Sequence, residues 1–117
     1  MVKAFVKSYM DIKEMEMEGG AKIRWLITHK DGAENYSMRY IRINENKETP
    51  AHKHPYEHEI FVISGMGYVV LDDETIKLKP YDFIFIPGDV FHKIHANSTM
   101  EILCVVPISA AKQLLGD

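Results

Sequence analysis

Short apolar runs alternate with turn signals along this chain, which is the pattern of an all-β sandwich or barrel. The segments expected to form strands are 23–28, 36–43, 58–63, 68–71, 75–78, 83–86, 91–95 and 101–106. Closing them into a barrel would remove the exposed edges that so many strands create. Residues 109–115 are expected to form a short helix, with Ser109 as its N-cap and Gly116 at its end.

Two of these strands carry a more specific pattern. Residues 83–86 are a continuous apolar run, so we expect this strand to be buried on both faces. In the strand at 58–63, successive side chains point to opposite faces, so His58 shares one face with Ile60 and Val62. His58 is therefore expected to face the apolar interior, where a lone imidazole lacks partners.

Composition and charge narrow the class of protein. The chain has 117 residues, of which 46% are hydrophobic, and this fits one domain over residues 1–117 with a barrel core at about 36–107. A net charge of −3 gives no basic stripe and argues against nucleic-acid binding. No apolar run approaches the ~18–20 residues that cross a bilayer, and the start of the chain lacks the apolar core of a signal peptide. We therefore expect a cytoplasmic protein with no membrane partner.

The histidines are the strongest chemical signal. His52, His54 and His58 lie close together, and His92 follows a Pro-Gly turn. Imidazole is the commonest side-chain metal ligand near neutral pH, because its unperturbed pKa of about 6.5 leaves a lone pair free. If His52 and His54 lie on one strand that Pro55 ends, their rings point to the same face. The four histidines therefore predict one metal site inside the barrel.

Histidines and cysteines also have roles that involve no metal. Isolated histidines are usually surface residues or satisfied core residues, and we expect this of His29 and of His95, which is out of phase with His92. The spacing is unlike that of a zinc finger or a zincin, and no paired cysteines support a structural zinc site. The single Cys104 cannot form an internal disulfide, which agrees with a reducing compartment.

The histidine spacing resembles the cupin superfamily. Its first motif reads Gly, five residues, His-x-His, three or four residues, Glu, six residues, Gly. The chain has His52-x-His54, three residues, His58, six residues and Gly65. The second motif reads Gly, five residues, Pro-x-Gly, two residues, His, three residues, Asn. Its counterpart here is residues 82–86, Pro87-Gly88-Asp89, His92 and, one residue late, Asn97.

The chain departs from these motifs at several positions. The usual glutamate position holds His58; Glu59 would serve only with a spacing of four, yet the distance to Gly65 favours His58. Gly88 is displaced by one from its expected position. The other glycine positions hold Asn46, Tyr81 and Asp89.

The four-histidine version resembles the small, single-domain, manganese-containing cupins of prokaryotes. The resemblance implies a double-stranded β-helix, or jelly-roll barrel, with extra N-terminal strands. It also implies a homodimer and one divalent metal ion per chain, manganese or iron first and nickel, copper or zinc as alternatives. The ligands it implies are His52, His54, His58 and His92.

Further pocket residues are expected from strand phase. Arg39 shares a face with apolar residues, where it either meets an anion or lies at the barrel mouth with its charge in solvent. Tyr56 either gates the opening or packs on the surface. Cys104 either lies near the metal or is plain packing. Glu57 and Glu59 are candidates to orient ligand imidazoles by hydrogen bonds, with Glu59 alternatively facing solvent or a partner subunit.

Three functions remain open on the sequence. The first is an oxidoreductase of dioxygenase type acting on a small organic substrate. The second is a non-redox metal enzyme, such as an isomerase, lyase or cyclase, with Tyr56 or Glu57 as its proton carrier. The third is a small-molecule-binding module without catalysis. One barrel hosts many chemistries, so fold alone does not separate them.

Overall fold

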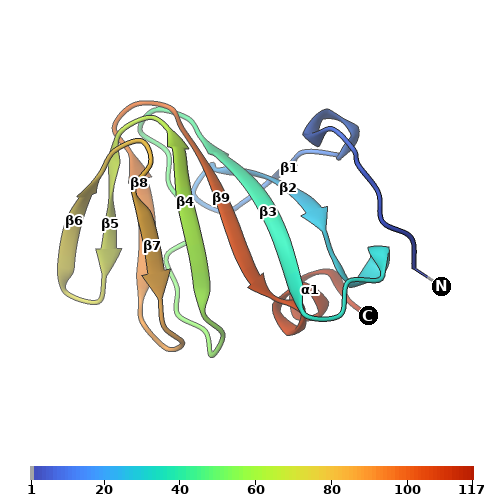
Figure 1. The fold of residues 1–117 in the computed structure, drawn as a ribbon. Coiled ribbons are helices and arrows are strands. Elements are labelled where there is room, and N and C mark those ends of the chain that lie inside the picture. Colours follow the sequence, from blue (N-terminus) through green and yellow to red (C-terminus); the bar gives the residue numbers. More distant parts are fainter. Residues whose placement is uncertain (1) are drawn as a thin grey trace.

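A computed structural model describes residues 2–117 of the chain (Figure 1). Two 3₁₀ turns, η1 (Tyr9–Asp11) and η2 (His29–Asp31), precede and interrupt the first strands. One helix, α1 (Ile108–Leu115), follows the last strand. The strands are β1 (Met15–Glu16), β2 (Lys22–Ile27), β3 (Tyr36–Ile43), β4 (His58–Ser64), β5 (Gly67–Leu71), β6 (Glu74–Leu78), β7 (Phe83–Ile86), β8 (His92–Ala96) and β9 (Met100–Pro107).

The strands form two antiparallel sheets of a jelly roll. The larger sheet has the order β1-β2-β3-β9-β4-β7, and the smaller has the order β6-β5-β8 (Figure 1). The all-β jelly roll with extra N-terminal strands and a short C-terminal helix is thus confirmed. The strands do not close into one continuous sheet, however, so β7 and β6 remain edges and the expected removal of edges is wrong.

The core lies on the inner face of the larger sheet. Along β9, Met100, Ile102, Cys104 and Val106 are buried and the residues between them are partly exposed, as period-two alternation requires. The register pairs Cys104 with Arg39 of β3 and with Ile60 of β4. One inward-facing row therefore carries a cation and a thiol among aliphatic side chains.

Two local expectations are wrong. Strand β7 is buried on one face only, because nothing in residues 2–117 covers its outer face: Phe83 and Phe85 are 83% and 56% exposed. The terminal helix begins at Ile108, with Pro107 rather than Ser109 as its N-cap. The Ile108 N–H donates to the Asn35 carbonyl at 3.0 Å, so tertiary structure satisfies the first helical N–H group.

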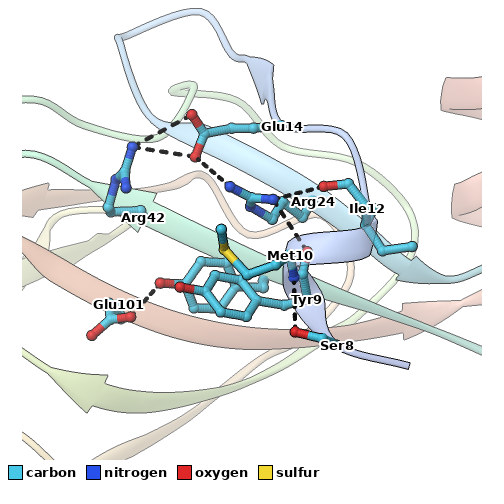
Figure 2. Close-up of polar contacts among 9 residues, drawn as sticks. Ser8, Tyr9, Met10, Ile12, Glu14, Arg24, Arg42 and Glu101 are labelled. Atoms are coloured by element: carbon cyan, nitrogen blue, oxygen red, sulfur yellow. Dashed lines mark hydrogen bonds and ion pairs between the residues drawn. The ribbon is translucent and has the colours of Figure 1, made fainter. Parts of the chain in front are cut away.

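The N-terminal segment is held on the outer face of the larger sheet (Figure 2). Arg24 donates through Nη1 to the carbonyls of Tyr9 and Ile12 at 3.1 and 2.7 Å, and its guanidinium lies 5.0 Å from the Tyr9 ring centroid. Glu14 lies between two arginines, 3.6 Å from Arg24 and 3.2 Å from Arg42. This network covers β2 and β3, and does not extend to β7. No helix in residues 2–117 is long and apolar enough to span a membrane.

Candidate metal centre

Four histidines come together where the two sheets meet. His58 opens β4 and His92 opens β8, and both side chains are buried. His52 and His54 lie in the extended connection between β3 and β4, where the expected strand is reduced to one bridge. In that bridge, the His92 N–H donates to the His52 carbonyl at 3.0 Å, and the reverse bond is 3.3 Å long. The backbone itself thus places His52 beside His92.

The four imidazole rings converge. Centroid separations are 4.8 Å for His52–His54, 5.1 Å for His52–His92 and 4.8 Å for His54–His92. His58 lies 4.5 Å from His54 and 4.9 Å from His92. One ring nitrogen each from His52, His54 and His92 lies within 4.8 Å of the others, which makes these three a candidate metal-binding group.

The hydrogen bonds of two rings fit a metal ligand set. His54 Nδ1 is 3.0 Å from the Tyr56 carbonyl, and His92 Nδ1 is 2.8 Å from the Val90 carbonyl. A carbonyl oxygen only accepts, so each Nδ1 carries the proton and each Nε2 keeps its lone pair. Backbone carbonyls therefore do the orienting that the sequence assigned to Glu57 and Glu59. No local sequence signal marks a backbone acceptor, which is why it was missed.

The protonation states also fit. Burial lowers the pKa of His58 to about 2, helped by the charge of Arg39, and lowers that of His54 to about 4, helped by His92. Burial likewise lowers the pKa of His52 and of His92. All four rings are then neutral near pH 7, and the neutral ring is the form that binds a metal.

His58 differs from the other three. The Arg39 guanidinium donates toward His58 Nδ1 at 3.3 Å, so this nitrogen acts as an acceptor and His58 Nε2 carries the proton. His58 Nε2 then donates to His54 Nε2 at 2.9 Å. For His58 to bind a metal through Nε2, its proton must move to Nδ1, where Cys104 Sγ is 3.4 Å away. The structure thus gathers all four histidines, but His58 must change tautomer, and so release His54 Nε2, before both can bind a metal.

A partly open, mostly apolar cavity of about 140 Å³ adjoins the histidines. Its lining is Met17, Arg39, Ile41, Thr49, Pro50, His52, Tyr56, His58, Ile60, His92, Ile94, Ile102, Cys104 and Leu114. Among these described residues there is no aspartate or glutamate. A cavity near 150 Å³ takes a benzene-sized molecule, so the volume suits a small organic ligand.

The structure places the remaining sequence candidates as follows. Tyr56 lines the cavity and stacks on His54 with centroids 3.8 Å apart, and burial raises its pKa. Burial also raises the pKa of Cys104, whose thiol lines the same cavity. Glu57 and Glu59 line a separate hollow, and Glu59 points outward on β4. Glu59 therefore cannot replace His58 as a ligand.

The other two histidines lie away from the cluster. His29 Nε2 is 2.6 Å from the Gly116 carbonyl. His95 stacks on Tyr68 with centroids 5.0 Å apart and lies 3.9 Å from a Glu48 carboxylate oxygen. Both have the structural roles that strand phase indicated.

Sequence reasoning missed part of the cavity wall. Met17 precedes β2 and Leu114 comes from α1, so only the tertiary fold brings them to the histidines. Trp25 was missed as well: its ring lies 5.2 Å from the Arg39 guanidinium. The register Trp25–Arg39 between β2 and β3 produces that contact, and no pattern within either strand reveals it.

Gly88 couples the Pro-Gly turn to the metal centre. A Cβ at Gly88 would lie 2.3 Å from the Pro55 carbonyl oxygen, and the next residue, Asp89, donates its N–H to the His54 carbonyl at 2.7 Å. We expect Gly88→Ala to displace the segment that carries His54 and to weaken zinc binding about 10–100-fold, the loss typical of disturbed ligand support. A titration against a chromophoric chelator measures this. Asp73→Ala, at an exposed hairpin tip, is the control; equal zinc affinity in both variants would contradict the coupling.

Comparison with known proteins gives consistent results. The model of the family described as "Cupin domain" matches residues 39–106. Polyketide synthase CurC of Streptomyces cyaneus is 31% identical over 113 residues, covering 92% of this chain and 73% of that protein. The solved structure of polyketide cyclase RemF from Streptomyces resistomycificus aligns with a TM-score of 0.82 at 30% identity, covering 91% and 80% of the two chains.

A more remote relative has a different name. The 1-methylthio-D-xylulose 5-phosphate methylsulfurylase of Rhodospirillum rubrum is 24% identical over 71 residues. That match covers 59% of this chain and 46% of the relative, so this chain spans about half the length of that protein.

Proposed function

This chain belongs to the cupin domain family, and we propose that it is a metal-dependent enzyme that activates a carbonyl group of a small organic substrate without redox change. The reaction class is that of a cyclase, isomerase or lyase. The observation that carries the proposal is the convergence of four neutral imidazoles, three of which (His52, His58 and His92) line a mostly apolar cavity.

The proposed cofactor is one divalent ion per chain. His52, His54 and His92 would hold it, with His58 as the fourth ligand after its proton moves to Nδ1. Manganese or iron is the first choice, and nickel, copper or zinc are the alternatives. When bound, the ion supplies a Lewis acid that stabilises negative charge developing on a carbonyl oxygen.

The protein's own groups provide the rest of the proposed chemistry. Ile60, Ile94 and Ile102 line the cavity and exclude water, which strengthens electrostatic interactions there. The Tyr56 hydroxyl is protonated near pH 7, as an ordinary tyrosine is, and burial raises its pKa further, so this side chain of the cavity lining carries a proton that it can donate. Glu57, the other proton carrier considered from the sequence, does not line this cavity.

A dioxygenase-type oxidoreductase stays the second candidate. This reaction would require O₂ as co-substrate and a redox-active ion with at least two open coordination positions. The relatives at 30% and 31% identity are named for polyketide cyclisation and polyketide synthesis, and neither name specifies an oxidation. This supports placing the non-redox reaction first.

Metal exchange tests the proposal. Metal-free protein is loaded separately with zinc, manganese and iron and given small diketones and β-keto esters, with hydrogen–deuterium exchange and ring closure followed by NMR and O₂ by electrode. We expect the zinc form to turn over without O₂ uptake. Turnover confined to the iron or manganese form, with matching O₂ uptake, would establish the oxidoreductase instead. Tight binding without turnover by any form would indicate a binding module.

We also propose that a second copy of the chain covers the outer face of β4 and β7. Phe61, Phe83 and Phe85 are 41%, 83% and 56% exposed there and line a hollow of about 440 Å³. Together these three side chains expose an area on the order of 350 Å², which is a large apolar patch. The patch would supply part of the ~800 Å² per chain that a stable interface buries. An apolar patch is complementary to itself across a two-fold axis, which supports a homodimer.

The double variant Phe83→Ser/Phe85→Ser tests this interface. We expect the parent to have twice the 13.5 kDa mass of one chain. We expect the dissociation constant of the variant dimer to be about tenfold higher or more, because the loss of interface aromatic residues weakens association. Light scattering coupled to size-exclusion chromatography measures both masses. Ile76→Ser, an exposed apolar residue on the smaller sheet, should leave the mass unchanged. A monomeric parent would refute the dimer.

A further inference from the structure

The Arg39 guanidinium is buried beside the histidines and has no acidic partner. Arg39 is 4% exposed, and none of the ion pairs in residues 2–117 includes it. Its contacts are Cys104 Sγ at 2.7 Å, His58 Nδ1 at 3.3 Å and the face of Trp25. Its buried Nε has no hydrogen-bond partner among the described residues. The guanidinium is therefore only partly satisfied by the protein.

This arrangement is costly for the folded protein. An arginine is always charged, and an unpaired buried charge costs several kcal/mol unless an anion compensates it. Arg42, three residues further along β3, shows the ordinary arrangement: it points outward and pairs with Glu14 at 3.2 Å (Figure 2). Arg39 instead points into the cavity, where the lining offers no carboxylate.

We infer that Arg39 is the anion-recognition residue of the cavity, and that the ligand is a small, mostly apolar molecule carrying one carboxylate or enolate-type oxygen. The oxygen pairs with the guanidinium, and the apolar body lies against Ile41, Ile60 and Ile102. As a substrate assignment this rests on the proposed function, whereas the Arg39 contact itself does not require the metal.

The cavity chemistry favours this class over phosphate esters and sugars. Arginine's planar fork matches a carboxylate, and paired hydrogen bonds of that kind are the strong ones. A phosphate ester would bring a second charge and a sugar several hydroxyl groups, and a mostly apolar wall offers few partners for such groups. Since Arg39 Nη2 is 3.3 Å from His58, an anion held by Arg39 also lies next to the histidine cluster.

Benzoate and its neutral analogue benzamide test the inference on metal-free protein. Calorimetry in the presence of a chelator removes any contribution of the metal to anion binding. We expect the parent to bind benzoate about tenfold more tightly than benzamide, or better, because a hydrogen bond to a charged group contributes that much. Arg39→Gln should abolish the preference, and Arg39→Lys should keep part of it. Arg42→Gln, which removes the same charge from the opposite face of β3, should leave it unchanged.

Equal affinity of the parent for both probes would overturn the inference, and so would a benzoate preference that persists in Arg39→Gln. Thermal unfolding of Arg39→Met adds a readout that does not depend on a ligand. Removing an unpaired buried charge should leave the midpoint equal or higher, whereas a large drop would show that the guanidinium is structural. A metal-free parent that prefers benzoate sustains the Arg39 assignment even if no metal form turns over, so the two proposals fail separately.

Discussion

Replacing His92 by alanine is expected to remove stoichiometric metal binding. The His92 side chain is buried and its Nδ1 is fixed by the Val90 carbonyl, so its Nε2 is the most firmly oriented donor of the cluster. Disturbing the support of a ligand costs about 10–100-fold in metal affinity, and removing the ligand itself should cost at least that much. Elemental analysis after dialysis should fall from about one ion per chain to a small fraction of that.

His95→Ala is the matched control. It removes an imidazole from the same strand but from the opposite face, where the ring stacks on Tyr68. We expect this variant to keep the metal content and zinc affinity of the parent. If His92→Ala retained a full complement of metal, the site would lie elsewhere and the proposed function would lose its basis.

The tautomer of His58 predicts that the histidine variants differ in how much zinc affinity they lose. His92 Nε2 offers a free lone pair, whereas the lone pair of His54 Nε2 accepts a hydrogen bond from His58, whose proton must first move to Nδ1. We therefore expect His58→Ala to lose less zinc affinity than His92→Ala in the same titration. An equal loss would mean that moving the His58 proton to Nδ1 costs little, and would contradict this order.

Strand periodicity predicted the inner face of this protein well, because it is a local rule. The phase of His58 and that of His92 both placed their rings in the interior, and the bounds of β3 and β7 match the expected segments. The rings of His52 and His54 also converge as expected, although their segment forms one bridge and no strand.

Two of the misses depend on packing between segments distant in sequence. Strand β7 is apolar throughout, and one of its faces is exposed because no other described element packs on it. The helix start depends on the Asn35 carbonyl. The role expected of Glu57 and Glu59 is a different case, because it is taken by carbonyls only two residues from each imidazole, those of Tyr56 and Val90. None of these contacts leaves a pattern within a strand or helix.

The motif glycines illustrate what a resemblance leaves open. At three positions where the family has glycine, this chain has Asn46, Tyr81 and Asp89, with φ of 66°, 74° and 63°. The backbone of this chain is therefore left-handed at all three positions, a conformation that glycine adopts most readily. For a side chain such as that of Tyr81, this conformation costs on the order of 1–2 kcal/mol.

Gly65 is the motif glycine that no other residue can replace, and Gly65→Ala is expected to lower the free energy of unfolding by about 3–5 kcal/mol. Two effects combine at this position. Its φ of +86° is unfavourable for any side chain. In addition, a Cβ would lie 2.2 Å from the Thr99 carbonyl oxygen and 2.6 Å from Met100 Cα, which are backbone atoms that cannot rotate away.

Gly116→Ala separates these two effects. Its φ of +84° is nearly the same, its ψ of 169° is also unfavourable for a side chain, and a Cβ there would meet nothing within 4 Å, so we expect a loss of about 1–2 kcal/mol from backbone strain alone. Urea unfolding of parent and both variants measures the difference, which assigns the remaining loss to the backbone contact with Thr99 and Met100. Equal losses in the two variants would show that the strand before β5 can move away from β9, and that the turn, rather than close packing, explains the glycine. Because the same contact joins the end of β4 to the start of β9, a shift there would also disturb the sheet that carries Arg39 and Cys104.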